Sequence, residues 1–165
     1  MKKSLRLCAA LLLVAAGLNA QAVRPPRAQP PTYAWAGMQL GRFDNEMLGI
    51  EFSLSAQVGK GGYGSLYYFG ASVPFSAGDQ VSEYGIMAGL CTRGRGAFAG
   101  VAAGLGVLKG WLGSSDEVTV FGVPFKMEAA LILNSFMAIN LQARAFICKR
   151  TYSGISLGLQ LGKMR

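Results

Sequence analysis

The sequence predicts an all-β fold, an eight-stranded antiparallel up-and-down barrel that spans a membrane and is preceded by an N-terminal signal peptide. Three observations predict it. Apolar and polar residues alternate with a period of two in about eight separate segments. Short turn-rich breaks separate these segments, as they do in antiparallel hairpins. The N-terminus has the charged, apolar and small-residue regions of an export signal.

The first residues predict export. Lys2, Lys3 and Arg6 give a positive start, and the apolar stretch that follows is too short to span a bilayer. An A-x-A cleavage signal ends at Ala22. Residues 1–22 are therefore expected to be a signal peptide that is removed on export.

Two regions are expected to follow the signal peptide. Residues 23–32 contain four prolines, too many for a strand or a helix, so an extended periplasmic leader is expected there. Residues 33–165 carry all the alternating segments and are expected to form one barrel domain.

The first four strands are predicted between residues 33 and 92. Residues 33–43 run up to the polar break DNEM. Residues 48–58 show the clearest alternation, because every even-numbered residue is apolar and the odd-numbered ones are polar or glycine. Residues 65–75 lie between the breaks GKGGYG and SAGDQV, and residues 82–92 end at RGRG.

The fifth strand is predicted at residues 97–109, before the break GWLGSSDE. This segment is apolar and glycine-rich, so a helix packed through small residues is an alternative. The apolar run is too short for a spanning helix, and Gly100, Gly104 and Gly106 share one face of a strand. A strand is therefore favoured.

The last three strands are predicted at residues 118–133, 137–148 and 155–163, separated by the breaks NSF and KRTYSG. Most of the eight segments have about the ten residues that a tilted strand needs to cross the hydrocarbon. An even number of strands lets the sheet close with both ends on one side. Both termini are therefore expected in the periplasm.

The composition of the two strand faces predicts which face meets the lipid. The inward set is small or polar: Gly85, Met87, Gly89, Gly100, Ala102, Gly104, Gly106, Ser156, Gly158, Gln160 and Gly162. The outward set carries no charge: Met127, Ala129, Leu131, Leu133, Met137, Ile139, Leu141, Ala143, Ala145, Ile147, Ile155, Leu157, Leu159 and Leu161. A soluble periplasmic lipocalin-like barrel that binds an apolar ligand is the alternative, with the faces reversed. Its water-facing side would be crowded with charged residues, whereas small residues suit a narrow lumen.

Many aromatic residues lie near the predicted strand ends, where a membrane barrel carries aromatic girdles at both interfaces. They are Tyr33, Trp35, Phe43, Tyr63, Phe75, Tyr84, Phe98, Trp111, Phe121, Phe136 and Tyr152. A girdle is therefore expected from these side chains, with ordinary strand propensity as the alternative explanation.

This arrangement resembles the small eight-stranded outer-membrane barrels of Gram-negative bacteria, the OmpA-transmembrane-domain and OmpX-like class. The stretch GVPFKMEAALILNSFMAINLQARAFICKRTYSGISLGLQLGKMR also resembles the final strands of a family of short outer-membrane barrel proteins. The resemblance implies an outer-membrane location, contact with outer-membrane lipids and lipopolysaccharide, and insertion by the barrel-assembly machinery. Many such barrels end in an aromatic residue, whereas this chain ends in Lys163-Met164-Arg165.

The sequence predicts no catalytic, cofactor or metal site. Barrels of this size that resemble lipid A deacylases or palmitoyltransferases depend on a histidine, and this chain has none. The same lack of histidine, with only Cys91 and Cys148 left after the signal peptide is removed, argues against a transition-metal site. The acidic residues are few and scattered, so a calcium site is not expected either. The basic residues are dispersed over the leader and the turns, so nucleic-acid binding is not expected either. No break carries a motif for a specific protein partner.

The chemistry that remains lies in the lumen. Alternation directs six polar side chains inward as a compensated structural network: Glu51, Lys126, Glu128, Gln142, Arg144 and Gln160. Gln57 and Asn140 share this direction. Arg144 is the predicted hub, with Glu128 on its diagonal and Glu51 across the lumen. The network is expected to plug the barrel, and a narrow gated pore is the alternative.

Overall fold

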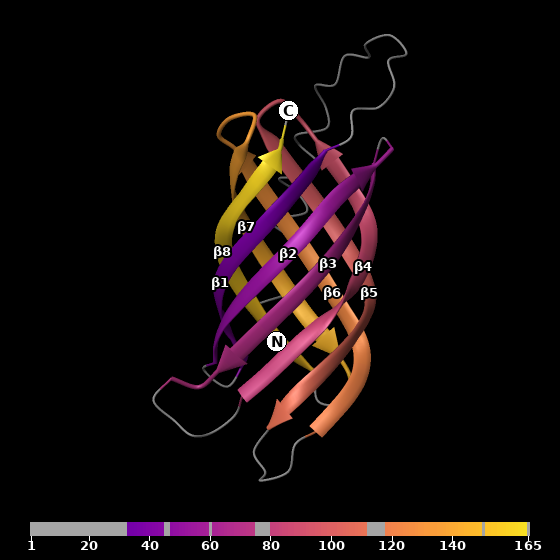
Figure 1. Ribbon diagram of the computed structural model, residues 1–165, viewed down its shortest axis with the longest axis vertical. Coiled ribbons are helices and arrows are strands. Elements are labelled where there is room, and N and C mark those ends of the chain that lie inside the picture. Colours follow the sequence, from indigo (N-terminus) through magenta and orange to yellow (C-terminus); the bar gives the residue numbers. More distant parts are fainter. Residues whose placement is uncertain are drawn as a thin grey trace, which may run out of the picture.

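The computed structural model is a closed barrel of eight antiparallel strands, in which the last strand pairs back onto the first (Figure 1). It describes residues 33–44, 47–59, 61–74, 80–111, 118–149 and 151–164. The predicted all-β fold class with eight strands is confirmed. The predicted signal peptide and leader, residues 1–32, lie outside the described residues.

The strands follow the predicted order along the chain. They are β1 (Ala34–Phe43), β2 (Leu48–Val58), β3 (Gly62–Ser72), β4 (Gln80–Arg93), β5 (Ala97–Trp111), β6 (Val118–Ile132), β7 (Met137–Ile147) and β8 (Tyr152–Lys163). The ends of β3 and the start of β8 differ from the prediction by three residues, and all other ends agree within two.

Cross-strand pairing explains the early start of β3 and β8. Gly62 belongs to a break by composition, yet it pairs with both β2 and β4. The turn is short because Gly59 has a φ of 68°, which glycine adopts more readily than other residues. Tyr152 likewise pairs with β7. Partners on neighbouring strands therefore set these ends, and local composition does not reveal them.

The glycine-rich segment that could have been a helix is the strand β5. It pairs along its length with β4 on one side and, apart from one gap, with β6 on the other. Within the described part of the chain, no helix has the length and apolar character needed to cross a bilayer.

The ladder between β5 and β6 is interrupted at Pro124. The register runs as far as Ala103 opposite Phe125 and resumes at Gly106 opposite Gly122. Proline has no backbone N–H to donate, and it is unusual in a strand that has neighbours on both sides. The wall therefore lacks regular pairing at one point within β5 and β6.

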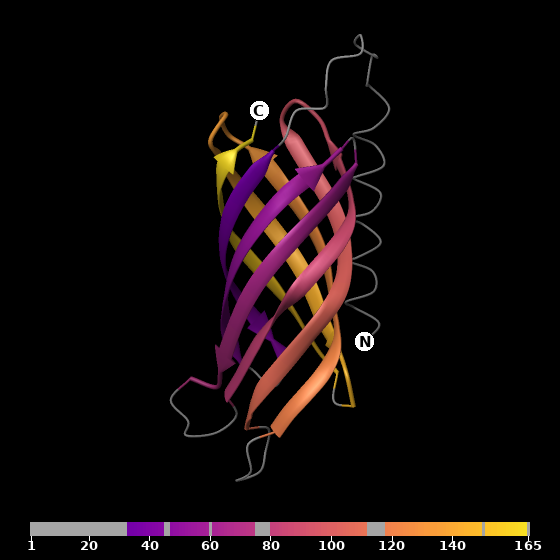
Figure 2. The same ribbon diagram turned by 45° about the vertical axis from the view of Figure 1, so that its right-hand side comes forward.

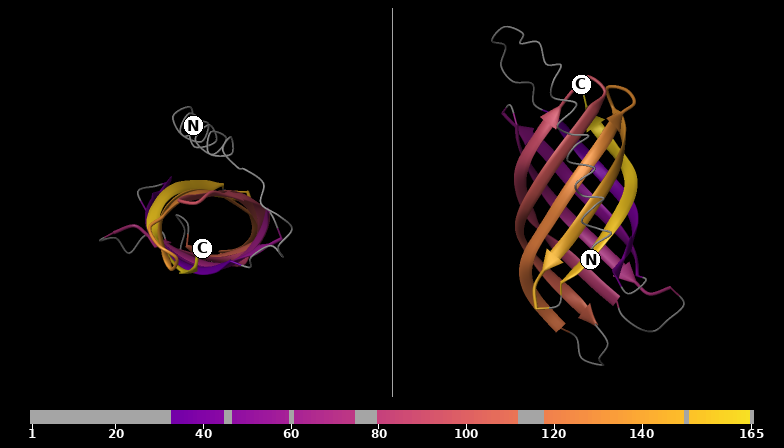
Figure 3. Two further views of the ribbon diagram at one scale, coloured as in Figure 1. Left: turned by 90° about the horizontal axis from the view of Figure 1, so that it is seen from above. Right: turned by 180° about the vertical axis from the view of Figure 1, so that it is seen from behind.

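The two ends of the barrel differ in their connections. The end where β1 begins and β8 finishes is here named the terminal rim, and it also carries the β2–β3, β4–β5 and β6–β7 turns (Figure 2). The opposite end is named the loop rim. Viewed along the barrel, the strands form a closed ring (Figure 3, left).

Side chains alternate between a buried lumen and an exposed outer wall. Leu54, Leu90 and Leu105 are 63%, 70% and 70% exposed on the outside. The outer wall is defined by such outward apolar residues, which include Met38, Leu40, Ile50, Phe52, Leu54, Leu66, Ile86, Leu90, Leu105, Phe121, Phe125, Leu131, Ile139, Ile147, Leu157, Leu159 and Leu161. Most polar side chains in the middle of the same strands are buried in the lumen, whereas Arg42, Lys109 and Lys163 near the strand ends are exposed.

Inward glycines allow neighbouring strands to coil closely around the narrow lumen. A Cβ atom at Gly104 would overlap the backbone of Ile86 and Met87 on β4. By contrast, a Cβ atom at Gly96, in the β4–β5 turn, would meet nothing. The small residues predicted for the inward face are therefore required sterically where β4 and β5 meet.

Candidate functional site

An aromatic cluster fills the lumen at the loop rim. It is named the loop-rim cluster and consists of Phe43, Phe69, Phe146 and Tyr152, all buried. The ring centroids of Phe43 and Phe69 are 4.6 Å apart, and Tyr152 lies 5.9 Å from both Phe69 and Phe146. The rings come from β1, β3, β7 and β8, so they join four strands across the lumen.

A second aromatic cluster lies at the terminal rim, and it corrects the predicted girdle. Trp35, Tyr63 and Phe98 are buried with ring centroids 5.2 to 6.2 Å apart. The girdle prediction is wrong for these three and for Phe43 and Tyr152, because all five have the parity of the inward face. Position near a strand end does not decide the side of the wall. Tyr84, Phe121 and Phe136 do face outward, and the side chains of Phe75 and Trp111 lie outside the description.

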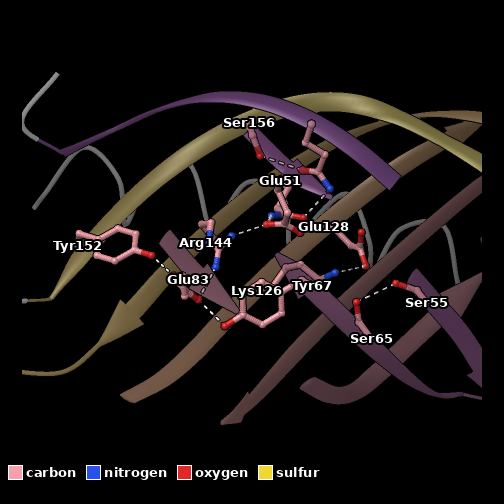
Figure 4. A network of polar contacts seen from close by, with 12 residues as sticks. Glu51, Ser55, Ser65, Tyr67, Glu83, Lys126, Glu128, Arg144, Tyr152 and Ser156 are labelled. Atoms are coloured by element: carbon pink, nitrogen blue, oxygen red, sulfur yellow. Dashed lines mark hydrogen bonds and ion pairs between the residues drawn. The ribbon is translucent and has the colours of Figure 1, made fainter. Parts of the chain in front are cut away.

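Arg144 on β7 is the centre of the polar lumen (Figure 4). Its Nη1 donates to Glu51 Oε2 at 2.5 Å, and its Nη2 donates to Glu83 Oε1 at 2.6 Å. Its guanidinium lies 4.3 Å from the ring centroid of Phe69 and 5.0 Å from that of Tyr67. The side chain therefore links β7 to β2 and β4 and stacks beneath the loop-rim cluster.

Glu83 was not among the predicted site residues, although the network depends on it. It is fully buried and accepts hydrogen bonds from the hydroxyls of Tyr67 and Tyr152 as well as from Arg144 (Figure 4). Alternation could have found it, because Glu83 has the same parity as the inward Gly85 and Met87.

A chain of amides continues from Glu51 toward β1 and β8. Gln142 Nε2 donates to Glu51 Oε2 at 2.8 Å, and Gln39 Nε2 donates to Gln142 Oε1 at 2.8 Å. Ser156 Oγ in turn donates to Gln39 Oε1 at 2.9 Å. Gln39 was also missed, although it shares the parity of the inward residues of β1.

Glu128 forms a separate group nearer the terminal rim. The predicted register is correct, since Glu128 lies opposite Gln142 and Lys126 lies opposite Arg144. However, the predicted diagonal contact of Glu128 with Arg144 is wrong. Glu128 is instead held by Asn140 and Gln160, which both donate to its Oε2 at 3.0 Å, and by Lys126, whose Nζ lies 3.4 Å from Oε1. Arg144 reaches across the lumen because two carboxylates are available there.

The structure therefore places all six predicted site residues inside the lumen, in two groups. The charged members, including Glu83, are three carboxylates and two cations, none more than 4% exposed. Opposite charges interact strongly where water is excluded, and a buried charge without a partner is costly. The arrangement can therefore fix side chains from opposite walls in one geometry.

Two observations on the described residues concern metal ligands and serines. Within that part of the chain, no group of three or more histidine, cysteine, aspartate or glutamate residues is placed to hold a metal ion. The buried serines Ser55 and Ser65 bond to each other, with their Oγ atoms 2.9 Å apart.

Comparisons with known proteins show the fold. No family model and no curated protein sequence matches the chain. The N-terminal barrel domain of Pseudomonas aeruginosa OprF is similar with a TM-score of 0.63 and 11% identity, covering 82% of this chain and 99% of that one. Ail, the attachment invasion locus protein of Yersinia pestis, gives a TM-score of 0.60 and 12% identity over the same shares. The outer-membrane enzyme PagL gives 0.53 and 14%, covering 77% of this chain and 98% of that one.

Solved outer-membrane barrels thus match most of this chain at low sequence identity, and each match covers nearly the whole of the solved barrel. The apolar outer wall and the polar lumen fit the same architecture. The predicted resemblance is confirmed at the level of the fold: this chain has the fold of the small eight-stranded outer-membrane β-barrels.

Proposed function

We propose that this chain is a non-catalytic integral outer-membrane barrel with a structural or interaction role, and that its own side chains plug the lumen. The observation that carries the proposal is the division of the two faces. Large apolar side chains are exposed around the outside, while the charged side chains of the lumen are buried and paired.

The outer wall supports a bilayer location over the soluble alternative. A soluble lipocalin-like barrel would bury its apolar residues and expose its charged ones. Here Phe121 is 79% exposed and Leu105 is 70% exposed, while Arg144 and Glu83 are buried. Exposed apolar surface of this extent is favourable against lipid tails and unfavourable against water.

The packing of the lumen supports a plug over an open pore. Arg144 spans the lumen between Glu51 and Glu83, and the loop-rim cluster packs over it. A pore requires a continuous aqueous path, and an eight-stranded barrel has an interior just wide enough for side chains. A gated pore would require the Arg144 ion pairs to rearrange together with the aromatic rings above them.

The absence of histidine supports a non-catalytic role, although the fold is shared with the enzyme PagL. A serine acts as a nucleophile only when an adjacent base activates it. Ser55, for example, is bonded to Ser65 instead.

The proposed partners follow from the proposed location. The outer wall contacts outer-membrane lipids, and lipopolysaccharide at the loop rim. The barrel-assembly machinery inserts the chain after the signal peptide is removed. Tyr68 and Tyr84, which pair across β3 and β4 and are 49% and 42% exposed, are suited to a lipid interface.

Expression of the full chain in a Gram-negative host and fractionation test the location. We expect the protein in the outer-membrane fraction, extracted only by detergent, and with a gel mobility that changes on heating. Recovery in a soluble periplasmic extract would contradict the proposal. Planar-bilayer recordings test the plug separately. A barrel that conducts no current supports the plug, whereas stable single-channel current steps would contradict it and support the pore.

A further inference from the structure

We propose that Met164 and Arg93 form a latch that closes the terminal rim over a buried water-binding site. The inference extends the proposed function, since it rests on the closed barrel but adds a site and a closure that the plug does not require. The residues that carry it lie at the terminal rim, on the other side of the Arg144 network from the loop rim.

Met164 is held inward at the end of the chain that the structure describes. Its side chain is 1% exposed, although its neighbour Lys163 is exposed. Its backbone N–H donates to Ser135 O at 2.8 Å, and the preceding Gly162 N–H donates to Phe136 O at 2.8 Å. The residue therefore continues the inward face of β8 past the end of the strand and packs against the lumen core.

Arg93 clamps Met164 from the opposite side of the rim. Its Nη1 donates to the Met164 carbonyl at 2.8 Å, and its Nε donates to Gln57 Oε1 at 3.2 Å. Its guanidinium lies 4.3 Å from the ring centroid of Tyr33, 5.0 Å from Phe98 and 5.4 Å from Trp35. One cation thus links Met164 to side chains on or beside β1, β2 and β5, so its loss removes the hydrogen bond that connects Met164 to those strands.

Polar atoms without a hydrogen-bond partner in the described residues lie beneath this latch. They are Trp35 Nε1, Tyr63 Oη, Lys126 Nζ, Glu128 Oε1 and Asn140 Oδ1. Lys126 Nζ lies 3.4 Å from Glu128 Oε1 and 5.7 Å from the Tyr63 ring centroid, and Tyr63 stacks on Trp35 at 6.2 Å. The set contains both donors and acceptors.

Water is the ligand that this mixed set fits. Buried polar groups that lack protein partners are generally satisfied by ordered water, and a buried water typically makes about three hydrogen bonds. An anion would be opposed by the Glu128 carboxylate, and a cation by the Lys126 ammonium. Toward the loop rim, the Arg144 network and the loop-rim cluster cover the site, so water exchanges through the terminal rim.

Cys91 is a natural reporter of the latch. Its half-buried side chain packs against the lumen core at the terminal rim, on the same strand as Arg93 and two residues before it. Cys148 follows β7 at the loop rim and serves as an internal reference. A Cys8→Ser background leaves these two thiols as the only reporters.

The test compares the rates at which a charged, membrane-impermeant methanethiosulfonate reagent modifies the two thiols in detergent-purified barrel. Arg93→Gln is expected to raise the Cys91 rate about tenfold, the effect of losing one hydrogen bond from a charged group. Met164→Ala keeps the backbone carbonyl that Arg93 binds but removes a buried side chain, and it is also expected to raise the Cys91 rate. The Cys148 rate is expected to stay the same. Leu161→Ala, which alters the lipid-facing side of β8, is the matched control and is expected to leave both rates unchanged.

A Cys91 rate equal to that of the parent in both folded variants would overturn the latch, and so would rates that rise at Cys91 and Cys148 together. If neither variant folds while Leu161→Ala does, Arg93 and Met164 are needed for folding itself, and the latch would also be overturned. A soluble protein in fractionation would instead overturn the barrel itself.

The water site is tested by NMR on the indole N–H of Trp35. We expect this group to show a cross-peak to bound water, and we expect that water to exchange faster in the variants. Absence of that cross-peak in the parent would overturn the site.

Discussion

At the scale of single residues, Arg144 shows why the lumen depends on contacts that are distant in sequence. It binds carboxylates 93 and 61 residues away, on strands that are not its neighbours. A bidentate guanidinium can serve both at once, whereas the ammonium of a lysine is a single point charge. The loss of this side chain would leave two buried carboxylates without their cation.

Replacement of Arg144 by Ala is therefore expected to destabilise the barrel by about 3 to 5 kcal/mol. Arg144→Lys is expected to lie between the parent and the Ala variant, because one ammonium cannot reproduce both ion pairs. Urea midpoints of reversible unfolding in lipid vesicles measure the change. Ala143→Leu, on the outward face, is the control and is expected to cost little; equal losses at positions 143 and 144 would show that Arg144 does not have this role.

Glu83 gives a second test at this scale. Glu83→Ala removes the acceptor for Tyr67, Tyr152 and Arg144, and we expect a loss of about 3 kcal/mol. Glu83→Gln keeps the shape and one acceptor oxygen, and the interior then holds two carboxylates and two cations, so we expect a loss of about 1 kcal/mol. The same unfolding measurement compares them. A Gln variant as unstable as the Ala variant would contradict this account of the charge balance.

At the scale of the strands, the sequence predicts most of the fold because alternation is a local property. The predicted bounds of Leu48–Val58 agree with the structure at both ends, because the polarity of each residue indicates which side of the wall it faces. The start of β3 could not be predicted from composition, because Gly62 is in a strand only through its partners on β2 and β4.

The same distinction applies to the candidate site. Parity predicts that Glu51 and Arg144 point inward, but it does not say which carboxylate meets which cation. That choice depends on which side chains meet across the lumen. Arg144 pairs with Glu83 and not with the predicted Glu128, which pairs with Lys126. Glu83 and Gln39 were missed even though their parity was readable. The aromatic residues were misassigned because strand ends were given more weight than parity.

The contact of β4 with β5 gives a prediction for whole strands. Gly104→Ala is expected to prevent most of the chain from folding, because its Cβ would overlap the backbone of Ile86, which no rotamer change can relieve. Gly96→Ala is the matched control, since nothing surrounds its Cβ. The fraction of heat-modifiable protein after refolding measures both. Equal yields would show that β4 and β5 can separate at little cost.

At the scale of the whole molecule, closure fixes the distances between distant parts of the chain. Cys91 lies near the end of β4 at the terminal rim, and Cys148 follows β7 at the loop rim. The two thiols are therefore separated by most of the height of the wall.

A disulfide between Cys91 and Cys148 requires Cα atoms within about 7 Å, which the closed barrel does not permit. We expect the protein exported to the oxidising periplasm to retain two thiols. Mass spectrometry after alkylation of the unfolded protein, with and without reduction, counts them. An intramolecular bridge would mean that the strand order is wrong.

The interruption of the β5–β6 ladder at Pro124 affects where the hydrogen bonds of the barrel wall open first. Between Ala103 and Gly106 the regular pairing of β5 with β6 is missing, although Gly104 and Leu105 still pair with β4 on their other side. Amides are protected from deuterium only while their hydrogen bonds remain closed, and protection differs from place to place in one structure. The seam beside Pro124 is thus where we expect deuterium to enter the wall first and lateral unzipping of the closed barrel to begin.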